Sequence, residues 1–177
     1  ARAAKPEDPV QVVLLMGVCG SGKTTIGRLL AKRLEWAFLE ADTFHLSEAR
    51  RRMAQGKPLD EADRGPWIGR IAEALAAQVA RREDTVLACS ALRAIHRDRL
   101  ARVAGGGWHV VHLSGAPELI AERLRERRDH YAGPELLESQ LATLESPKDA
   151  QNLSIDQSPE ALVESIASWL DGESSLA

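Results

Sequence analysis

The stretch that decides the fold lies near the N-terminus and reads Gly17-Val18-Cys19-Gly20-Ser21-Gly22-Lys23-Thr24. It matches the pattern G-x-x-x-x-G-K-[ST] of a phosphate-binding loop, or P-loop. A short apolar run precedes it and an amphipathic segment follows it, which is the strand–loop–helix context that such a loop requires. Because glycine has no Cβ, backbone N–H groups can close around a phosphate, and the next helix adds the positive end of its dipole. The sequence therefore predicts a nucleotide-binding protein rather than a chance glycine-rich turn.

Two side chains of this loop have the chemistry that a bound triphosphate needs. Lys23 can reach the β- and γ-phosphates, and the hydroxyl of Thr24 can hold Mg²⁺. The predicted cofactors are thus ATP and Mg²⁺, with the metal at Thr24. The predicted nucleotide-binding residues are Gly17, Val18, Cys19, Gly20, Ser21, Gly22, Lys23, Thr24 and Thr25. Cys19 lies where only backbone donors matter, so we expect its thiol to be tolerated rather than reactive.

Composition limits the partners of the chain. Its 177 residues suit one domain, and 23 basic against 26 acidic residues give a net charge of −3, unlike a dedicated nucleic-acid binder. The 2 cysteines cannot form a disulfide framework or a multi-cysteine zinc site. No signal peptide is visible, and the longest apolar run, residues 12–16, is too short to cross a membrane. We therefore expect a cytoplasmic protein without nucleic-acid or membrane partners.

Short apolar runs alternate with amphipathic segments along the chain, as in βαβ units around a parallel sheet. Strands are expected at 10–16, 37–40, 85–89, 109–113 and 153–155. One helical stripe runs through Ile68, Ile71, Ala72, Leu75 and Val79. A second lies at 162–170 behind the cap Ser158-Pro159, and Pro117 and Pro134 are expected to open two more helices. The prediction is an α/β fold with a doubly wound parallel sheet, forming a single domain over 10–177 behind a tail at 1–9.

The P-loop alone does not decide the class of nucleotide protein. GTPase switches read guanine with Asn-Lys-x-Asp, but Asn152, the only asparagine, precedes Leu153. Motor and AAA-type ATPases place an acid after a later buried strand, and none follows 85–89. Asp42, just after the strand expected at 37–40, is the acid that small-molecule kinases use beside the γ-phosphate. The alternative for Asp42 is an N-cap of the next helix.

Further motifs carry a family resemblance. They are Glu40-Ala41-Asp42 with His45, Met53, Gly56, Pro58-Leu59, Asp63-Arg64 with Pro66-Trp67, Cys89-Ser90-Ala91-Leu92-Arg93 with Arg97-Asp98, Leu136-Leu137, Ser139-Gln140 and Thr143-Leu144-Glu145. In this order and over nearly the whole chain, the sequence resembles the gluconate kinases (gluconokinases), relatives of shikimate and adenylate kinases. The resemblance implies transfer of the γ-phosphate of ATP to the 6-hydroxyl of D-gluconate. It further implies a cytoplasmic homodimer, a parallel five-stranded sheet with helices on both faces, and a mobile lid at about 123–135. The chain departs from the family pattern at Cys19, Leu46, Ala49 and Asp129.

The resemblance and the residue types together predict an active site. The expected catalytic residues are Lys23, Asp42, Arg123 and Arg127. Arg123 and Arg127 are four apart and should share a helix face, where two guanidinium groups would neutralise a triphosphate; the alternative is a solvated arginine-rich helix. The expected substrate-binding residues are Asp42, His45, Asp63, Arg64, Trp67, Ser90, Arg93 and His130.

Arg64 could bind the carboxylate of a sugar acid, and Asp63 could accept from one of its hydroxyl groups. The alternative is that Asp63 caps a helix and Arg64 forms an ion pair at the surface. Residues 50–52 are three consecutive arginines and are expected to form a solvated helix face, with one member able to reach the site. Two other functions stay open on the sequence. One is a kinase for another small hydroxy acid such as shikimate, and the other is a non-catalytic ATP-binding module.

Overall fold

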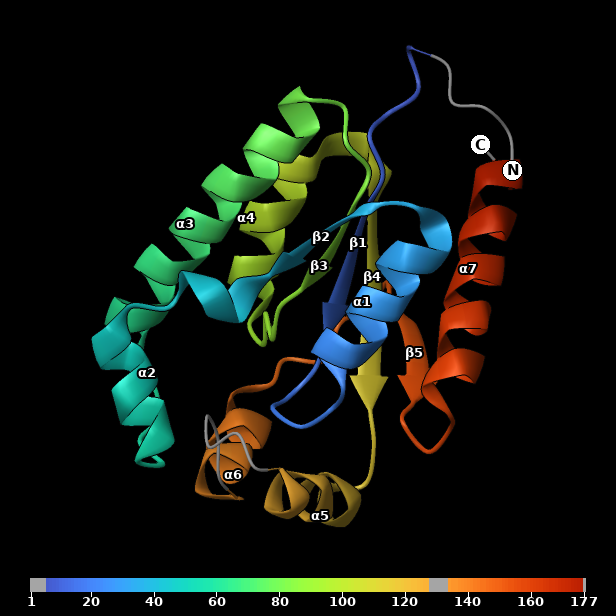
Figure 1. Ribbon diagram of the computed structural model, residues 1–177. Coiled ribbons are helices and arrows are strands. Elements are labelled where there is room, and N and C mark those ends of the chain that lie inside the picture. The colour runs from blue at the N-terminus through green and yellow to red at the C-terminus, as the bar shows by residue number, and fades with distance from the viewer. Residues whose placement is uncertain (1–5, 128–133, 177) are drawn as a thin grey trace.

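The computed structural model of the protein describes residues 6–127 and 134–176 (Figure 1). Its strands are β1 (Val12–Met16), β2 (Ala37–Glu40), β3 (Thr85–Ala88), β4 (Trp108–Ser114) and β5 (Gln151–Ser154). Its α-helices are α1 (Lys23–Leu34), α2 (Ser47–Ala54), α3 (Glu61–Ala80), α4 (Ala94–Ala104), α5 (Pro117–Glu126), α6 (Pro134–Thr143) and α7 (Pro159–Leu176). Two short 3₁₀ helices, η1 (Ala41–Phe44) and η2 (Gly105–Gly107), follow β2 and α4.

The five strands form one parallel sheet in the order β2-β3-β1-β4-β5. The central strand β1 pairs on one edge with β3, where Val12 lies opposite Thr85, and on the other with β4, where Val12 lies opposite Trp108. All five residues of β1 are buried, as expected for a strand covered on both faces. The predicted five-stranded parallel sheet is confirmed.

Helices cover both faces of the sheet (Figure 1). Val13 and Leu15 of β1 belong to a core shared with α1, α5 and α7. Val12, Leu14 and Met16 point the other way, into a core shared with α3 and α4. The two cores follow from the period of two along a strand, so one continuous apolar run supplies both layers. The predicted stripe at 68–79 faces the second core.

The predicted helix starts are also confirmed. The Ser158 hydroxyl accepts a hydrogen bond from the Ala161 N–H at 3.1 Å and so caps the start of α7. Pro117 and Pro134 are the first residues of α5 and α6, where the missing proline N–H costs nothing. Strand ends differ from the expectation by one or two residues. In particular, β1 starts at Val12 rather than at residue 10, and β5 covers Gln151–Ser154 rather than 153–155.

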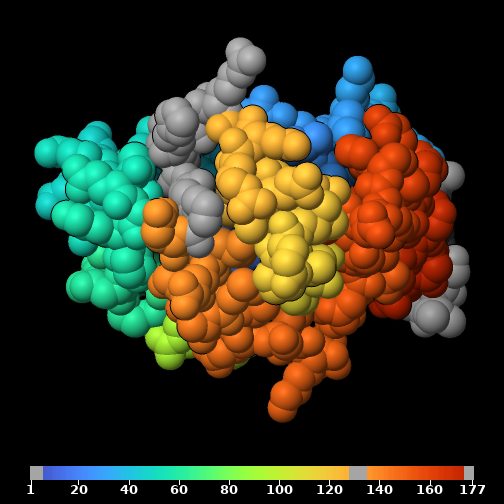
Figure 2. Space-filling model, turned by 90° about the horizontal axis from the view of Figure 1, so that it is seen from below, coloured from blue at the N-terminus to red at the C-terminus, as the bar shows by residue number. Residues whose placement is uncertain are grey.

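The sheet topology fixes where a ligand can lie. The chain leaves β1 toward α1 on one face, and β3 and β4 flank β1 on opposite sides, so the strand order reverses at the carboxyl end of β1. Such a switch point opens a crevice at the carboxyl edge of the sheet. Figure 2 views this edge, where α6 and α5 lie between α2 and α7. Part of the expected lid, residues 128–133, lies outside the described residues. Within the described residues, no helix is long and apolar enough to span a membrane.

Candidate active site

The P-loop connects β1 to α1 and has the backbone shape that its glycines allow. Gly22, the N-cap of α1, has a φ of 96°, and Gly20 has a φ of 80°, both in the left-handed region that residues with a Cβ rarely adopt. The Ser21 N–H donates to the Val18 carbonyl at 3.2 Å, which closes the turn of the loop. No acidic residue lies in the first turn of α1, so its positive dipole end is free for an anion.

Lys23 folds back along the loop. Its ammonium group donates to the Val18 carbonyl at 2.9 Å. Burial lowers the pKa of Lys23, and the nearby carboxylate of Asp42 partly opposes this shift. The ammonium group therefore lies at the mouth of the loop, where the phosphates of a nucleotide would replace its carbonyl partner.

Thr24 and Glu40 form a pair of oxygen donors beside Lys23. The Thr24 hydroxyl donates to one carboxylate oxygen of Glu40, and the other oxygen accepts from the Asp42 N–H at 3.2 Å. Hydroxyl and carboxylate oxygens are the ligands that Mg²⁺ takes, together with waters and phosphate oxygens. These residues fit the ion, although no cluster of three or more metal-ligating side chains occurs among the described residues. Sequence reasoning missed Glu40, whose place at the end of a strand two residues before Asp42 was the available signal.

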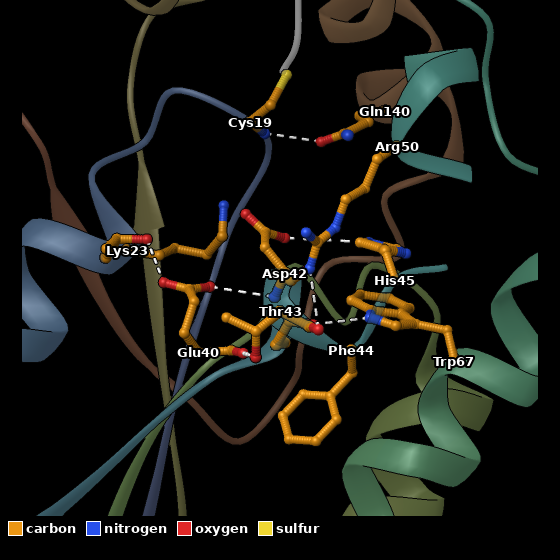
Figure 3. Close-up of polar contacts among 12 residues, drawn as sticks. Cys19, Lys23, Glu40, Asp42, Thr43, Phe44, His45, Arg50, Trp67 and Gln140 are labelled. Atoms are coloured by element: carbon orange, nitrogen blue, oxygen red, sulfur yellow. Dashed lines mark hydrogen bonds and ion pairs between the residues drawn. The ribbon is translucent and has the colours of Figure 1, made fainter. Parts of the chain in front are cut away.

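Asp42 lies in η1 with its side chain 73% exposed. The side chain that caps η1 is that of Glu40, and the N-cap of α2 is Leu46, which makes no side-chain cap, so Asp42 is not a helix cap. The backbone of η1 is tied to α3 because Trp67 Nε1 donates to the Ala41 carbonyl at 2.8 Å (Figure 3). This bond places the Asp42 carboxylate opposite the P-loop.

His45 packs flat against Trp67, with ring centroids 4.2 Å apart and an interplanar angle of 11°. Burial lowers the pKa of His45 to about 4, so the ring is neutral near pH 7. Its Nε2 lies 4.0 Å from a carboxylate oxygen of Asp42. A neutral imidazole at this distance can donate to or accept from a hydroxyl group that lies between them.

Lys23, Thr24, Asp42 and His45 line one cavity that opens to solvent at the carboxyl edge of the sheet. The lining residues come from the P-loop, η1, α2, α3, the segments before α3 and after β3, and α6. They are Cys19, Gly20, Gly22, Lys23, Thr24, Asp42, His45, Arg50, Met53, Pro58, Leu59, Arg64, Trp67, Ser90, Leu92, Arg127, Leu136, Ser139 and Gln140.

Two arginines, Arg50 and Arg64, add positive charge to the lining of the cavity. Arg50 donates from Nη2 to the carbonyls of Asp42 and Thr43, at 3.3 and 2.9 Å. The guanidinium of Arg64 lines the cavity and has no hydrogen-bond or ion-pair partner among the described residues. Burial lowers the pKa of Arg64, and the charges of Glu61, Asp60 and Asp63 partly oppose this shift. Residues 50–52 were expected to form a solvated helix face with one member able to reach the site, and Arg50 is the member that lines the cavity.

The structure gives two of the expected substrate residues other partners. Asp63 forms a capping box with Asp60 at the start of α3 and an ion pair with Arg52, and it does not line the cavity. Arg93 pairs with Glu61 at 2.8 Å and with Glu145 at 3.4 Å, again outside the cavity. The expected contacts of Asp63 and Arg93 with substrate are therefore not supported by their positions. For Asp63, the capping alternative describes the structure.

A second cavity lies on the α7 side of the P-loop. Arg123 and Arg127 both reach it, and Arg123 donates to the Ile155 carbonyl at 2.9 Å. Helix α5 ends at Glu126, and Arg127 has an extended backbone with φ −71° and ψ 133°. The prediction that the two arginines share a helix face is therefore wrong, because the second one lies beyond the helix. Thr25 also lines this cavity, and His130 lies outside the described residues.

The fold and this site define a class, the P-loop kinases of small molecules. An acid and two arginines line one cavity together with the P-loop, which is the arrangement for phosphoryl transfer to an anionic acceptor. Comparisons with known proteins agree. Residues 12–147 match the family model described as an AAA domain, although β3 runs into Cys89-Ser90 without the strand-end acid of motor ATPases.

The relatives narrow the class to one family. The probable gluconokinase of Rattus norvegicus is 43% identical, over 82% of this chain and 90% of its own. The gluconokinase of Gluconobacter oxydans is 37% identical, over 91% and 92%. Among solved structures, a gluconokinase from Sinorhizobium meliloti aligns with a TM-score of 0.81 and 37% identity over 92% of both chains. The chain belongs to the gluconokinase family, as its motifs indicated. A shikimate kinase from Aquifex aeolicus, at 18% identity and a TM-score of 0.57, shares the fold.

Proposed function

We propose that this protein transfers the γ-phosphoryl group of ATP to the 6-hydroxyl of D-gluconate, which yields 6-phospho-D-gluconate and ADP. The observation that carries the proposal is the placement of Asp42 and Arg64 in one cavity with Lys23 of the P-loop. A carboxylate beside the phosphates can take a hydroxyl proton, and an unpaired guanidinium can bind a carboxylate. Family membership supports gluconate as the acceptor, since the relatives named above are gluconokinases.

The chemistry follows from these positions. The acceptor oxygen attacks the γ-phosphorus in line, the bond from that phosphorus to the β–γ bridging oxygen breaks, and the hydroxyl proton passes to Asp42. Lys23 and Arg127 line the cavity where negative charge accumulates, so they stabilise the transferring group. Thr24 and Glu40 would hold Mg²⁺, which neutralises charge on the β- and γ-phosphate oxygens when it is bound.

The second cavity suits the nucleoside part of ATP. It begins at Gly20 and Gly22, so it continues directly from the phosphate site, and Arg123 and Arg127 line it. In the acceptor half, Arg64 binds the carboxylate of the sugar acid, and His45, Trp67 and Ser90 lie around its hydroxyl-bearing chain. Arg50 adds a second positive charge there.

The remaining parts of the proposal rest on the sequence pattern and the family resemblance. They are a homodimer, a location in the cytoplasm, a tail at 1–9 before a kinase domain at 10–177, and a lid over about 123–135 that includes His130. Light scattering coupled to size-exclusion chromatography measures the mass in solution, and a monomer at micromolar concentration would contradict the dimer.

A coupled assay of ADP release tests the function. With Mg²⁺ and ATP, we expect turnover that depends on gluconate, a product identified as 6-phosphogluconate, and little turnover with shikimate. Turnover of shikimate without turnover of gluconate would replace the acceptor and keep the kinase. ATP binding without turnover of any hydroxy acid would favour a non-catalytic ATP-binding module.

A further inference from the structure

Gln140 on α6 touches the P-loop, and the proposed mechanism gives it no part. Its Oε1 accepts a hydrogen bond from the Cys19 N–H at 2.7 Å, across 121 residues of sequence (Figure 3). Both residues line the main cavity, as do Lys23 and Asp42. A neutral side chain from a distant helix therefore lies against the loop beside the groups proposed to carry out the transfer.

The hydrogen bond also fixes which way the carboxamide faces. A backbone N–H can only donate, so the oxygen of Gln140 must face Cys19 and the NH₂ group must turn away from it. No acceptor for this NH₂ group lies within hydrogen-bond distance in residues 6–127 and 134–176. Two N–H donors are thus open to a ligand in the cavity.

The helix that carries Gln140 is held in place at its C-terminal end. The Glu145 N–H, just past α6, donates to the Leu92 carbonyl at 2.8 Å. Arg97 Nη2 donates to the Glu145 carbonyl at 2.8 Å, and its Nη1 donates to Leu92 at 3.0 Å. Leu136 and Leu137 anchor the apolar side of the same helix in the protein interior. Gln140 is therefore positioned by rigid neighbours, which is what precise binding of a ligand requires.

The neighbours of Gln140 in the cavity indicate the kind of ligand. Ser139 and Leu136 of α6 line the same cavity as Met53 and Arg50 of α2, which we assign to the acceptor half. In Figure 3 the amide nitrogen of Gln140 lies on the side of Arg50, and the amide oxygen on the side of Cys19. A polyol chain supplies the hydroxyl oxygens that two neutral N–H donors can bind.

We propose that Gln140 binds the sugar acid and the P-loop at once, with its oxygen on the Cys19 N–H and its NH₂ group on a hydroxyl oxygen at C4 or C5 of the acceptor. This inference rests on the proposed function, because it takes gluconate as the acceptor. The two contacts set the distance between the reacting hydroxyl group and the phosphates. Gln140 is thus a specificity-determining residue, selective for acceptors with a hydroxyl group near the reacting end.

Gln140→Leu and Gln140→Met test the inference, since both keep an apolar stem and remove the amide. We expect the gluconate KM to rise about tenfold, as for the loss of one or two neutral hydrogen bonds, while the Kd of ADP stays within a factor of about two. Glu138→Gln, at an exposed position on the same helix, should match the wild type. An altered Kd of ADP with an unchanged gluconate KM would show that Gln140 only shapes the loop, and no change in either constant would also overturn the inference.

A second measurement compares acceptors. Wild-type enzyme should lose about as much kcat/KM on 4-deoxy- or 5-deoxygluconate as Gln140→Leu loses on gluconate. The two losses should not add when variant and deoxy substrate are combined. Additive losses in kcat/KM with both deoxy acids would show that Gln140 does not bind the hydroxyl group at C4 or C5. Turnover of gluconate by the wild type tests the proposed function. The ratio of kcat/KM between Gln140→Leu and the wild type tests the role of Gln140 separately.

Discussion

Replacement of Arg97 by methionine should destabilise the protein strongly without touching the P-loop. Arg97 is 7% exposed, and its guanidinium donates to the carbonyls of Ala91 at 2.8 Å, Leu92 at 3.0 Å and Glu145 at 2.8 Å. Methionine keeps the length and the apolar stem of the side chain but has no donor. It therefore leaves three carbonyls without this partner.

The magnitude follows from the carbonyls of Ala91 and Glu145, which lose this partner, because the Leu92 carbonyl keeps its bond from the Glu145 N–H. A buried acceptor that is left without a hydrogen bond costs about 1–3 kcal/mol. Part of this cost is offset in the variant, because burial disfavours the charged guanidinium and lowers the pKa of Arg97. We expect a net loss of about 3–5 kcal/mol in the free energy of unfolding, out of a total of about 5–15 kcal/mol for a typical domain. At about 2–4 °C per kcal/mol for a chain of this size, Tm should fall by about 6–20 °C.

Urea unfolding followed by circular dichroism measures this change. The matched control is Arg99→Met, two residues along α4, where the exposed guanidinium makes one long bond of 3.3 Å to the Gly65 carbonyl. The control should lose less than about 1 kcal/mol. A variant at Arg97 within about 1 kcal/mol of the control would refute the reasoning, because the three bonds would then contribute nothing net. Ala91 has a φ of 39°, so without Arg97 the segment that carries Ser90 should also relax and raise the gluconate KM.

Three further outcomes are expected. Asp42→Asn should lower kcat by about 10²–10⁴-fold with the Kd of ADP unchanged, and near-normal turnover would remove the role of Asp42 as base. Arg64→Gln should raise the gluconate KM by about 10–100-fold, which is the effect of losing a charge-assisted hydrogen bond. It should also raise the kcat/KM for a neutral polyol relative to that for gluconate. Equal effects on both acceptors would contradict the carboxylate contact. The pKa of His45 falls from 6.5 unfolded to about 4 folded, so the unfolded state binds the extra proton between these values. Stability contributed by neutral His45 should be complete above about pH 6.5 and be lost as the pH falls toward 4, and His45→Gln should flatten this part of a plot of unfolding free energy against pH.

The sequence alone predicted those features that depend on neighbours along the chain. The P-loop is local, so its residues identify it without knowledge of the fold. Proline and serine at helix starts act within one turn, which is why the beginnings of α5, α6 and α7 were predictable. The continuous apolar run of β1 indicated a strand covered on both faces, and the structure places it at the centre of the sheet.

What sequence reasoning missed depends on angles between elements. Three consecutive arginines at 50–52 look alike in the sequence, and only the orientation of α2 brings Arg50 to the cavity and Arg52 to Asp63. Gln140 meets Cys19 only after the sheet and α6 have formed, so the motif Ser139-Gln140 marked the residue without revealing its contact with the P-loop. Arg127 was placed on a helix because a spacing of four suits a helix, but α5 ends one residue earlier.

The parallel sheet also has a consequence for how the chain folds during synthesis. The central strand β1 leaves the ribosome before its partners β3 and β4, so Val12 cannot pair until Thr85 and Trp108 have been synthesised. Every residue of β1 is apolar, and an unpaired apolar strand is prone to aggregate. We expect nascent chains that end before β3 to bind chaperones that recognise extended apolar segments, and this binding to cease once β4 has emerged.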